Sequence, residues 1–270
     1  MLRFNPIPMQ HNATSISLSH PVIHGSAWSG TSPRYSHVPT SLIVDSLQQA
    51  GWVYTAGTAR ISRRPERQEH VAHVLRFSHP SMPTIRGNRP EAVVVNSHDG
   101  TTRLKVMLGI FRVACANGLV VQSESVGGVS MVRSGLRLDD VISAVDSMIY
   151  RAPRAIEIVD KWSSIHLDGD QTMALARRMA RVRWPDATSW SVLDAIAIRR
   201  PEDSGDDLWT VFNRIQESII RGGPCVTIMR DVNGQRTPRT FRAGAIRGAL
   251  RAVEINENLW AVGEEAASAF

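Results

Sequence analysis

Residues 52–62 read WVYTAGTARIS, residues 70–80 read HVAHVLRFSHP, and residues 91–97 read EAVVVNS. All three segments are rich in the β-branched and aromatic residues that strands favour. Turn-forming residues separate them, and the sequence His-Asp-Gly at 98–100 follows the third segment as a hairpin turn. The three segments therefore predict neighbouring strands of an antiparallel sheet, and this sheet decides the fold.

Helices are expected on both sides of these strands. One begins at Thr40, whose side chain would cap the free amides, and ends at Gly51. A second is predicted over residues 101–117, where apolar side chains recur at helical spacing, although the first half of this stretch also alternates as a strand would. Residues 119–122 and 129–133 would then pair with each other as a hairpin.

After residue 135 the pattern becomes helical. A helix is predicted over 139–150 with a break or a kink at Pro153, because proline lacks the amide hydrogen that continues a helix. Further helices are expected over four stretches: 170–182, 188–199, 206–222 and 253–267.

This order of elements favours an α+β fold. We expect an N-terminal antiparallel sheet with packed helices, in a helix–three strands–helix core, followed by a mainly helical C-terminal half. By residue number, 1–36 is interpreted as a flexible N-terminal arm, 37–135 as a basic α+β core, and 136–270 as a mainly helical region packed on the core.

Composition excludes several classes of protein. The chain has 270 residues with 43% hydrophobic and 21% charged side chains, as a folded globular protein does. Its apolar runs are shorter than the roughly 18 residues of a membrane helix, and its start does not follow the secretory pattern. Cys115 and Cys225 are too few for a disulfide framework or a four-cysteine zinc site. We therefore expect a cytosolic chain with reduced thiols.

The net positive charge of the chain resides in its N-terminal half. Residues 1–135 hold 13 basic and 6 acidic side chains, whereas residues 136–270 hold 18 and 19. A second basic stretch, residues 230–251, holds six arginines and one acidic residue. Such asymmetry is typical of proteins that bind a polyanion, and an ordinary basic surface is the alternative.

The predicted sheet and the helix after it would form a basic groove that holds a single-stranded backbone. Six side chains are expected to contact phosphates: Arg60, Arg63, Arg64, Arg103, Lys105 and Arg112. Trp52 or Tyr54 would stack on bases. We assign no catalytic residue, no metal site and no cofactor.

His98 and Asp99 form the polar centre of the turn after the third strand. A catalytic pair is the functional alternative, but residues adjacent in sequence rarely point at each other, so a turn is favoured. His70, His73 and His79 lack acidic or cysteine partners at a known metal spacing, which disfavours a metal site.

Several motifs occur together along the chain: YSHVPT (35–40), NSHDG (96–100), GIFRVACANGL (109–119), RRPED (199–203), LWTVFNRIQE (208–217) and RGG (221–223). In combination the chain resembles the phage/plasmid-like proteins grouped as domain of unknown function 932, over about residues 35–265. The resemblance marks ten family positions: Asn96, His98, Asp99, Gly100, Arg112, Asn117, Gly118, Asn213, Gln216 and Glu217.

The resemblance implies a gene of a phage, prophage or plasmid whose product works in the bacterial cytoplasm, and it implies no established activity. The expected order of helix, three strands and helix is similar to the core of single-strand annealing proteins. We therefore expect a nucleic-acid-binding homo-oligomer that binds or anneals single-stranded DNA in recombination or replication. The alternatives are an interaction protein that inhibits a host defence factor, and a metal-dependent nuclease.

Overall fold

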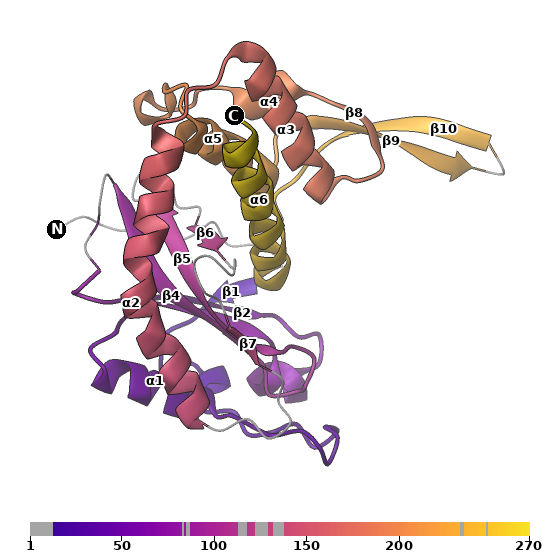
Figure 1. Ribbon diagram of the computed structural model, residues 1–270. Helices are drawn as coiled ribbons and strands as arrows, with labels where there is room; N and C mark the ends of the chain where they lie inside the picture. The colour runs from indigo at the N-terminus through magenta and orange to yellow at the C-terminus, as the bar shows by residue number, and fades with distance from the viewer. Residues whose placement is uncertain are drawn as a thin grey trace. The chain divides into compact units, whose positions relative to one another are not determined.

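The structure, a computed structural model, describes residues 13–82, 84, 87–112, 118–121, 129–131, 138–232, 235–246 and 248–270. The chain forms two units. The first comprises Met1–Ile156 and Arg247–Val253, and the second comprises Glu157–Ile246 and Glu254–Phe270. A large antiparallel sheet dominates the first unit and helices dominate the second (Figure 1), which confirms the predicted α+β class.

The sheet of the first unit follows the chain, and each strand pairs with the next: β1 (Ala13–Ser15), β2 (Val53–Arg60), β3 (His73–Ser78), β4 (Asn88–Asn96), β5 (Leu104–Arg112) and β6 (Gly118–Val121). β7 (Val129–Met131) also pairs with β5, beside β6 on the same edge. β2, β3 and β4 are the three strands that the sequence predicts. The predicted pairing of residues 119–122 with 129–133 is not formed by their described parts, 119–121 and 129–131, because these pair with β5 instead.

The helix predicted over 101–117 is wrong for residues 104–112, which form β5; residues 113–117 lie outside the described part. β5 buries side chains on both faces, with Leu104, Val106 and Leu108 on one face and Met107 on the other. An apolar run that is buried on both faces satisfies a helical spacing as well as a strand spacing. The pairing of residues 105–112 of β5 with β4 decides in favour of the strand.

Residues 13–36 are packed on the sheet. β1 pairs with β2, and a 3₁₀ turn, η1 (Pro21–Ile23), buries Val22 and Ile23. The prediction of a flexible arm is therefore wrong for this part; residues 1–12 lie outside the described residues. The helix expected at Thr40 is confirmed as α1 (Thr40–Gln49), and Gly51 ends it with a φ of 88°.

One long helix, α2 (Leu138–Ser163), contributes residues to both units and contains Pro153 without a break. Of the two predicted alternatives, the break is wrong, because a proline inside a helix removes one backbone hydrogen bond and need not end the helix. Val141 and Val145 of α2 line a small cavity with Ile43 and Leu47 of α1, so these two helices pack together in the first unit.

The second unit contains the remaining helices: α3 (Gly169–Arg183), α4 (Val192–Ile196), α5 (Leu208–Arg221) and most of α6 (Ala249–Ala269). A three-stranded sheet completes it: β8 (Ala187–Trp190), β9 (Cys225–Val232) and β10 (Gln235–Arg242), in the order β10-β9-β8. The helix predicted over 188–199 is wrong at its start, where β8 precedes the short α4. Within the described residues, no helix combines the length and the apolarity needed to cross a membrane.

Two exposed side chains beside α5 give a pH prediction. His166 Nδ1 lies 2.8 Å from Asp206 Oδ1, and this hydrogen bond raises the pKa of His166 and lowers the pKa of Asp206. The stability that His166 contributes is present below its ordinary pKa of about 6.5 and is lost as the pH rises through the raised value. NMR titration should show a His166 pKa above 6.5 that falls in Asp206→Asn. An unchanged His166 pKa in that variant would contradict the assignment.

Candidate nucleic-acid interface

Antiparallel pairing brings four strand ends to one end of the first-unit sheet, where β2 and β4 finish and β3 and β5 begin. Three cross-strand pairs show this: Ala59–His73, His73–Asn96 and Val95–Lys105. The loop of residues 61–72 therefore lies beside the loop of residues 97–103. A hydrogen bond from His98 N to His70 O, 2.9 Å long, joins the two loops directly.

This end of the sheet gathers cations that are far apart in the sequence. Arg60, Arg63, Arg64 and Arg103 are exposed there, and Lys105 is partly buried; these five side chains are called the basic sheet end. None of the four arginines forms an ion pair with another described residue. Three carboxylates share the two loops: Glu66, Glu69 and Asp99.

Three of the residues predicted to bind nucleic acid lie elsewhere. Arg112 is the last residue of β5, so its backbone lies about 27 Å along the strand from Leu104, at the opposite end of β5 from the basic sheet end. Trp52 is 2% exposed and packs against His79, so its predicted role in base stacking is wrong. Tyr54 is half-buried; its hydroxyl donates to Ile16 O and its ring packs edge-on against Phe77, so it is not an open stacking platform either.

A cluster of buried polar side chains lies beneath the two loops. Thr40 Oγ1 lies 2.8 Å from His73 Nε2, and Asn96 Nδ2 donates to the same hydroxyl at 2.8 Å. His98 Nδ1 lies 3.0 Å from His37 Nε2. This histidine cluster (His37, Thr40, His73, Asn96 and His98) joins the motif at 35–40 to the motif at 96–100.

Backbone carbonyls define which ring nitrogens carry hydrogen in this cluster. His98 Nε2 lies 2.9 Å from Val22 O and must donate, so in a neutral ring Nδ1 accepts from His37. His73 Nδ1 lies 2.9 Å from Val71 O and also donates, so its Nε2 accepts from Thr40. The cluster therefore fixes the loops of the basic sheet end in place. Both motifs are visible in the sequence. Only their contact in the structure shows that together they hold these loops in place.

Asp99 does not pair with His98. Its Oδ1 accepts from the amide and the hydroxyl of Thr101, and Gly100 has a φ of 74°, so residues 98–100 form the predicted turn. Asn117, a further family position, lies outside the described residues, and Gly118 begins β6. Within the described part of the chain, no three His, Cys, Asp or Glu side chains are placed to hold a metal ion.

One aromatic group at this end was not singled out in the sequence. Trp28 is half-buried, its backbone N donates to His98 O, and the guanidinium of Arg67 lies 4.8 Å from its ring centroid. His70 meets the same indole edge-on at 5.2 Å. An arginine on an indole face is a cation–π contact, and it places an aromatic ring among the cations of the basic sheet end.

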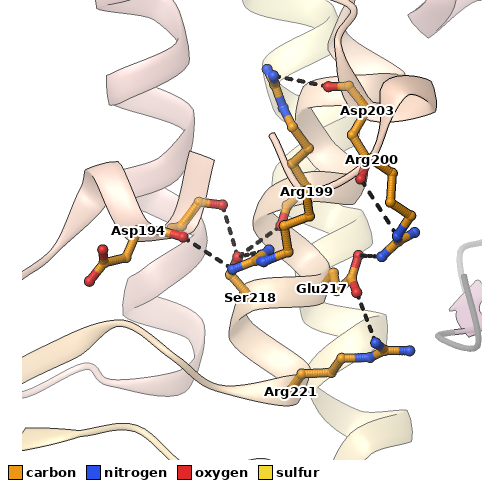
Figure 2. A network of polar contacts seen from close by, with 9 residues as sticks. Asp194, Arg199, Arg200, Asp203, Glu217, Ser218 and Arg221 are labelled. Carbon is orange, nitrogen blue, oxygen red and sulfur yellow. Dashed lines mark hydrogen bonds and ion pairs between the residues drawn. The ribbon is translucent and has the colours of Figure 1, made fainter. Parts of the chain in front are cut away.

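The second unit holds a separate polar network (Figure 2). Glu217 of α5 is buried, and its two carboxylate oxygens contact Arg200 and Arg221. Arg199 donates to Ser218 Oγ at 2.7 Å and to Asp194 O at 3.2 Å. These contacts attach residues 199–203 and α4 to α5. Because the carboxylate is held by two guanidinium groups, the network has a structural role rather than that of a catalytic base.

The other family positions of α5 are also buried. Asn213 Nδ2 donates to Trp209 O at 2.7 Å, and Gln216 Nε2 donates to Asn256 Oδ1 of α6 at 2.8 Å. The motif at 208–217 therefore supplies polar contacts that orient the helices of the second unit.

The motif residues at 35–40 and 96–100 thus lie in a polar network of the first unit, and those at 199–203 and 208–217 lie in a polar network of the second unit. A family profile described as a domain of unknown function, DUF932, matches residues 27–259. The chain belongs to this family. Two relatives from Escherichia coli (strain K12), UPF0380 protein YfjQ and UPF0380 protein YafZ, are each 34% identical over 236 residues, covering 86% of this chain and 82% of theirs. No solved structure matches the chain.

Proposed function

We propose that this DUF932 protein binds single-stranded DNA at the basic sheet end. The observation that carries the proposal is the convergence of four exposed arginines, one from the end of β2 and three from two loops, on one end of the sheet. The carboxylates in these loops are fewer, and Asp99 already accepts hydrogen bonds within its own turn. An arginine without a protein partner is available to contact phosphate.

One further feature favours a single strand over a duplex. Trp28, half-buried and with Arg67 over its ring, places an aromatic side chain beside the cations, and base stacking on aromatic rings is a general way to hold unpaired bases. The contacts need no base-specific group, as expected for a protein that must accept any sequence. Together with the resemblance to phage and plasmid proteins, this supports a role in strand annealing during recombination or replication, with several protomers along one strand.

The test is binding of a labelled single-stranded oligonucleotide at low and physiological salt, measured by fluorescence anisotropy. The variant replaces Arg60, Arg63 and Arg64 with glutamine. Loss of three phosphate contacts should reduce the slope of log K against log salt by about 2 and weaken binding at physiological salt at least tenfold.

A matched control replaces three exposed arginines of the helices α2 and α3: Arg151, Arg177 and Arg181. This control removes the same net charge and should keep the salt slope of the wild-type protein. Equal binding by the wild-type protein and the Arg60/Arg63/Arg64 variant, with both folded by circular dichroism, would refute the proposed site.

A further inference from the structure

We propose that the hairpin of β9 and β10 is a second nucleic-acid contact, which enters a groove of duplex DNA. This inference does not depend on the basic sheet end, because the hairpin belongs to the other unit. β10 and the last three residues of β9 lie in the basic stretch 230–251, for which the sequence predicts no strand.

The hairpin extends beyond the sheet that supports it. β9 and β10 pair over eight residues each, from Cys225–Arg242 at the base to Val232–Gln235 near the tip. β8 pairs only with residues 226–228 of β9, so the outer part is a ribbon of two strands (Figure 1). Eight residues of strand span about 27 Å, and the width of a two-stranded ribbon suits the major groove of B-DNA.

The side chains of the ribbon suit a polyanion. Every described residue of β10 is exposed except Phe241, which is half-buried. Arg230, Arg236, Arg239 and Arg242 are exposed, and none of them forms an ion pair with another described residue. Asp231 is the only carboxylate in the two strands. A ribbon that buries so little apolar surface contributes little to folding, which points to a contact with a partner.

The arginines lie on both faces of the ribbon. Arg236 and Arg242 share one face, and Arg239 occupies the other, because side chains alternate along a strand. Arg230 lies opposite Thr237 and therefore shares the face of Arg239. A ribbon in a groove is flanked by a phosphate backbone on each side, so cations on both faces are within reach of phosphates.

The free edge of β10 does not suit strand addition by a protein partner. Pro238 lies in the middle of this strand and has no amide hydrogen to donate to a further strand. Exposed charged side chains along an edge also oppose pairing with another sheet. These features favour a groove of duplex DNA over an extended peptide.

The test compares a single strand with a duplex of the same length in two variants of the full chain. The ribbon variant replaces Arg230, Arg236, Arg239 and Arg242 with glutamine, and the sheet-end variant is the Arg60/Arg63/Arg64 variant above. The ribbon variant should lower the salt slope for duplex DNA by about 3 to 4 and should leave single-strand binding unchanged. Replacing the same four residues with lysine, which keeps the charge, should retain duplex binding.

The two proposals fail separately. Unchanged duplex affinity and salt slope in the folded glutamine variant of the ribbon would overturn this inference. The inference would also be overturned if the ribbon variant lost binding to poly-glutamate, an acidic polypeptide, but kept binding to duplex DNA. If the ribbon variant loses duplex binding while the sheet-end variant still binds single strands like wild type, the inference stands and the proposed function fails.

Discussion

Replacing Glu91 with leucine is expected to lower the free energy of unfolding by about 3–5 kcal/mol. Glu91 is fully buried on the sheet, with Oε2 2.7 Å from Arg76 Nε and 3.1 Å from Thr55 Oγ1. Arg89 Nη2 lies 2.5 Å from its other oxygen. The substitution would leave the charge of Arg76, whose side chain is 16% exposed, without its main counterion.

Arg76 cannot easily turn to solvent to recover. Its guanidinium lies 3.3 Å from the ring centroid of Phe111, and burial already lowers the pKa of Arg76 while Glu91 opposes that shift. Gly109 supplies the room for this ring, because a Cβ there would lie 2.4 Å from Phe111 Cε2. The charged group and its surroundings are therefore packed as one rigid cluster.

Urea unfolding followed by circular dichroism measures this effect. Glu66→Gln, at an exposed carboxylate, is the control and should change the free energy of unfolding by less than about 0.5 kcal/mol. Because a buried ion pair can be exchanged for apolar groups at little net loss, the double variant Glu91→Leu with Arg76→Met should recover much of the stability. A loss below 1 kcal/mol in Glu91→Leu would contradict the assigned role.

The second large effect is expected in the core of the other unit. Replacing Trp162 with alanine should lower the free energy of unfolding by about 3–5 kcal/mol. Trp162 is 1% exposed; its ring stacks on Trp260 at a centroid distance of 4.5 Å and meets Phe212 edge-on at 5.3 Å. These neighbours are themselves large and buried, so they would not collapse into the cavity that the missing indole leaves.

The close packing around this ring gives a control and a second variant. Trp190→Ala, at a half-buried tryptophan of β8, should reduce the free energy of unfolding by less than half as much. Gly263→Ala should also lower the free energy of unfolding, but through overpacking rather than through a cavity, because a Cβ at Gly263 would lie 2.2 Å from Trp162 Cη2. Equal stability of Trp162→Ala and wild type in urea would show that this cluster does not support the second unit.

The elements that the sequence predicted correctly are those whose own residues indicate their type and their ends. β2, β3 and β4 combine β-branched residues with turn residues at their ends, and α1 has an apolar stripe that ends at a glycine of positive φ. The turn at residues 98–100 is confirmed, as is the helix stop at Gly222, whose φ is 82°. These features depend on local conformational preferences, which are present in the amino-acid order.

The elements that the sequence missed depend on distant partners. β5 became a strand because β4 pairs along it, although its apolar spacing also fits a helix. β9 and β10 were missed because they lack the alternation of apolar and polar residues that marks a half-buried strand. Most of the hairpin is exposed, so neither of its faces needs apolar side chains. The side chain of Thr40 was expected to cap α1 but instead joins the histidine cluster, so its function follows from contacts with residues 33 and 58 positions away.

The amino-acid order by itself determined the α+β class, the first strands of the sheet and the family. It also located both basic stretches, because charge can be counted without knowing the fold. Only the tertiary structure decided which arginines lie together: it grouped Arg103 with Arg60, separated Arg112 from both, and placed the second stretch on a projecting ribbon. Strand register and hydrogen bonds between distant residues set these positions, and such pairings are not encoded in any local segment.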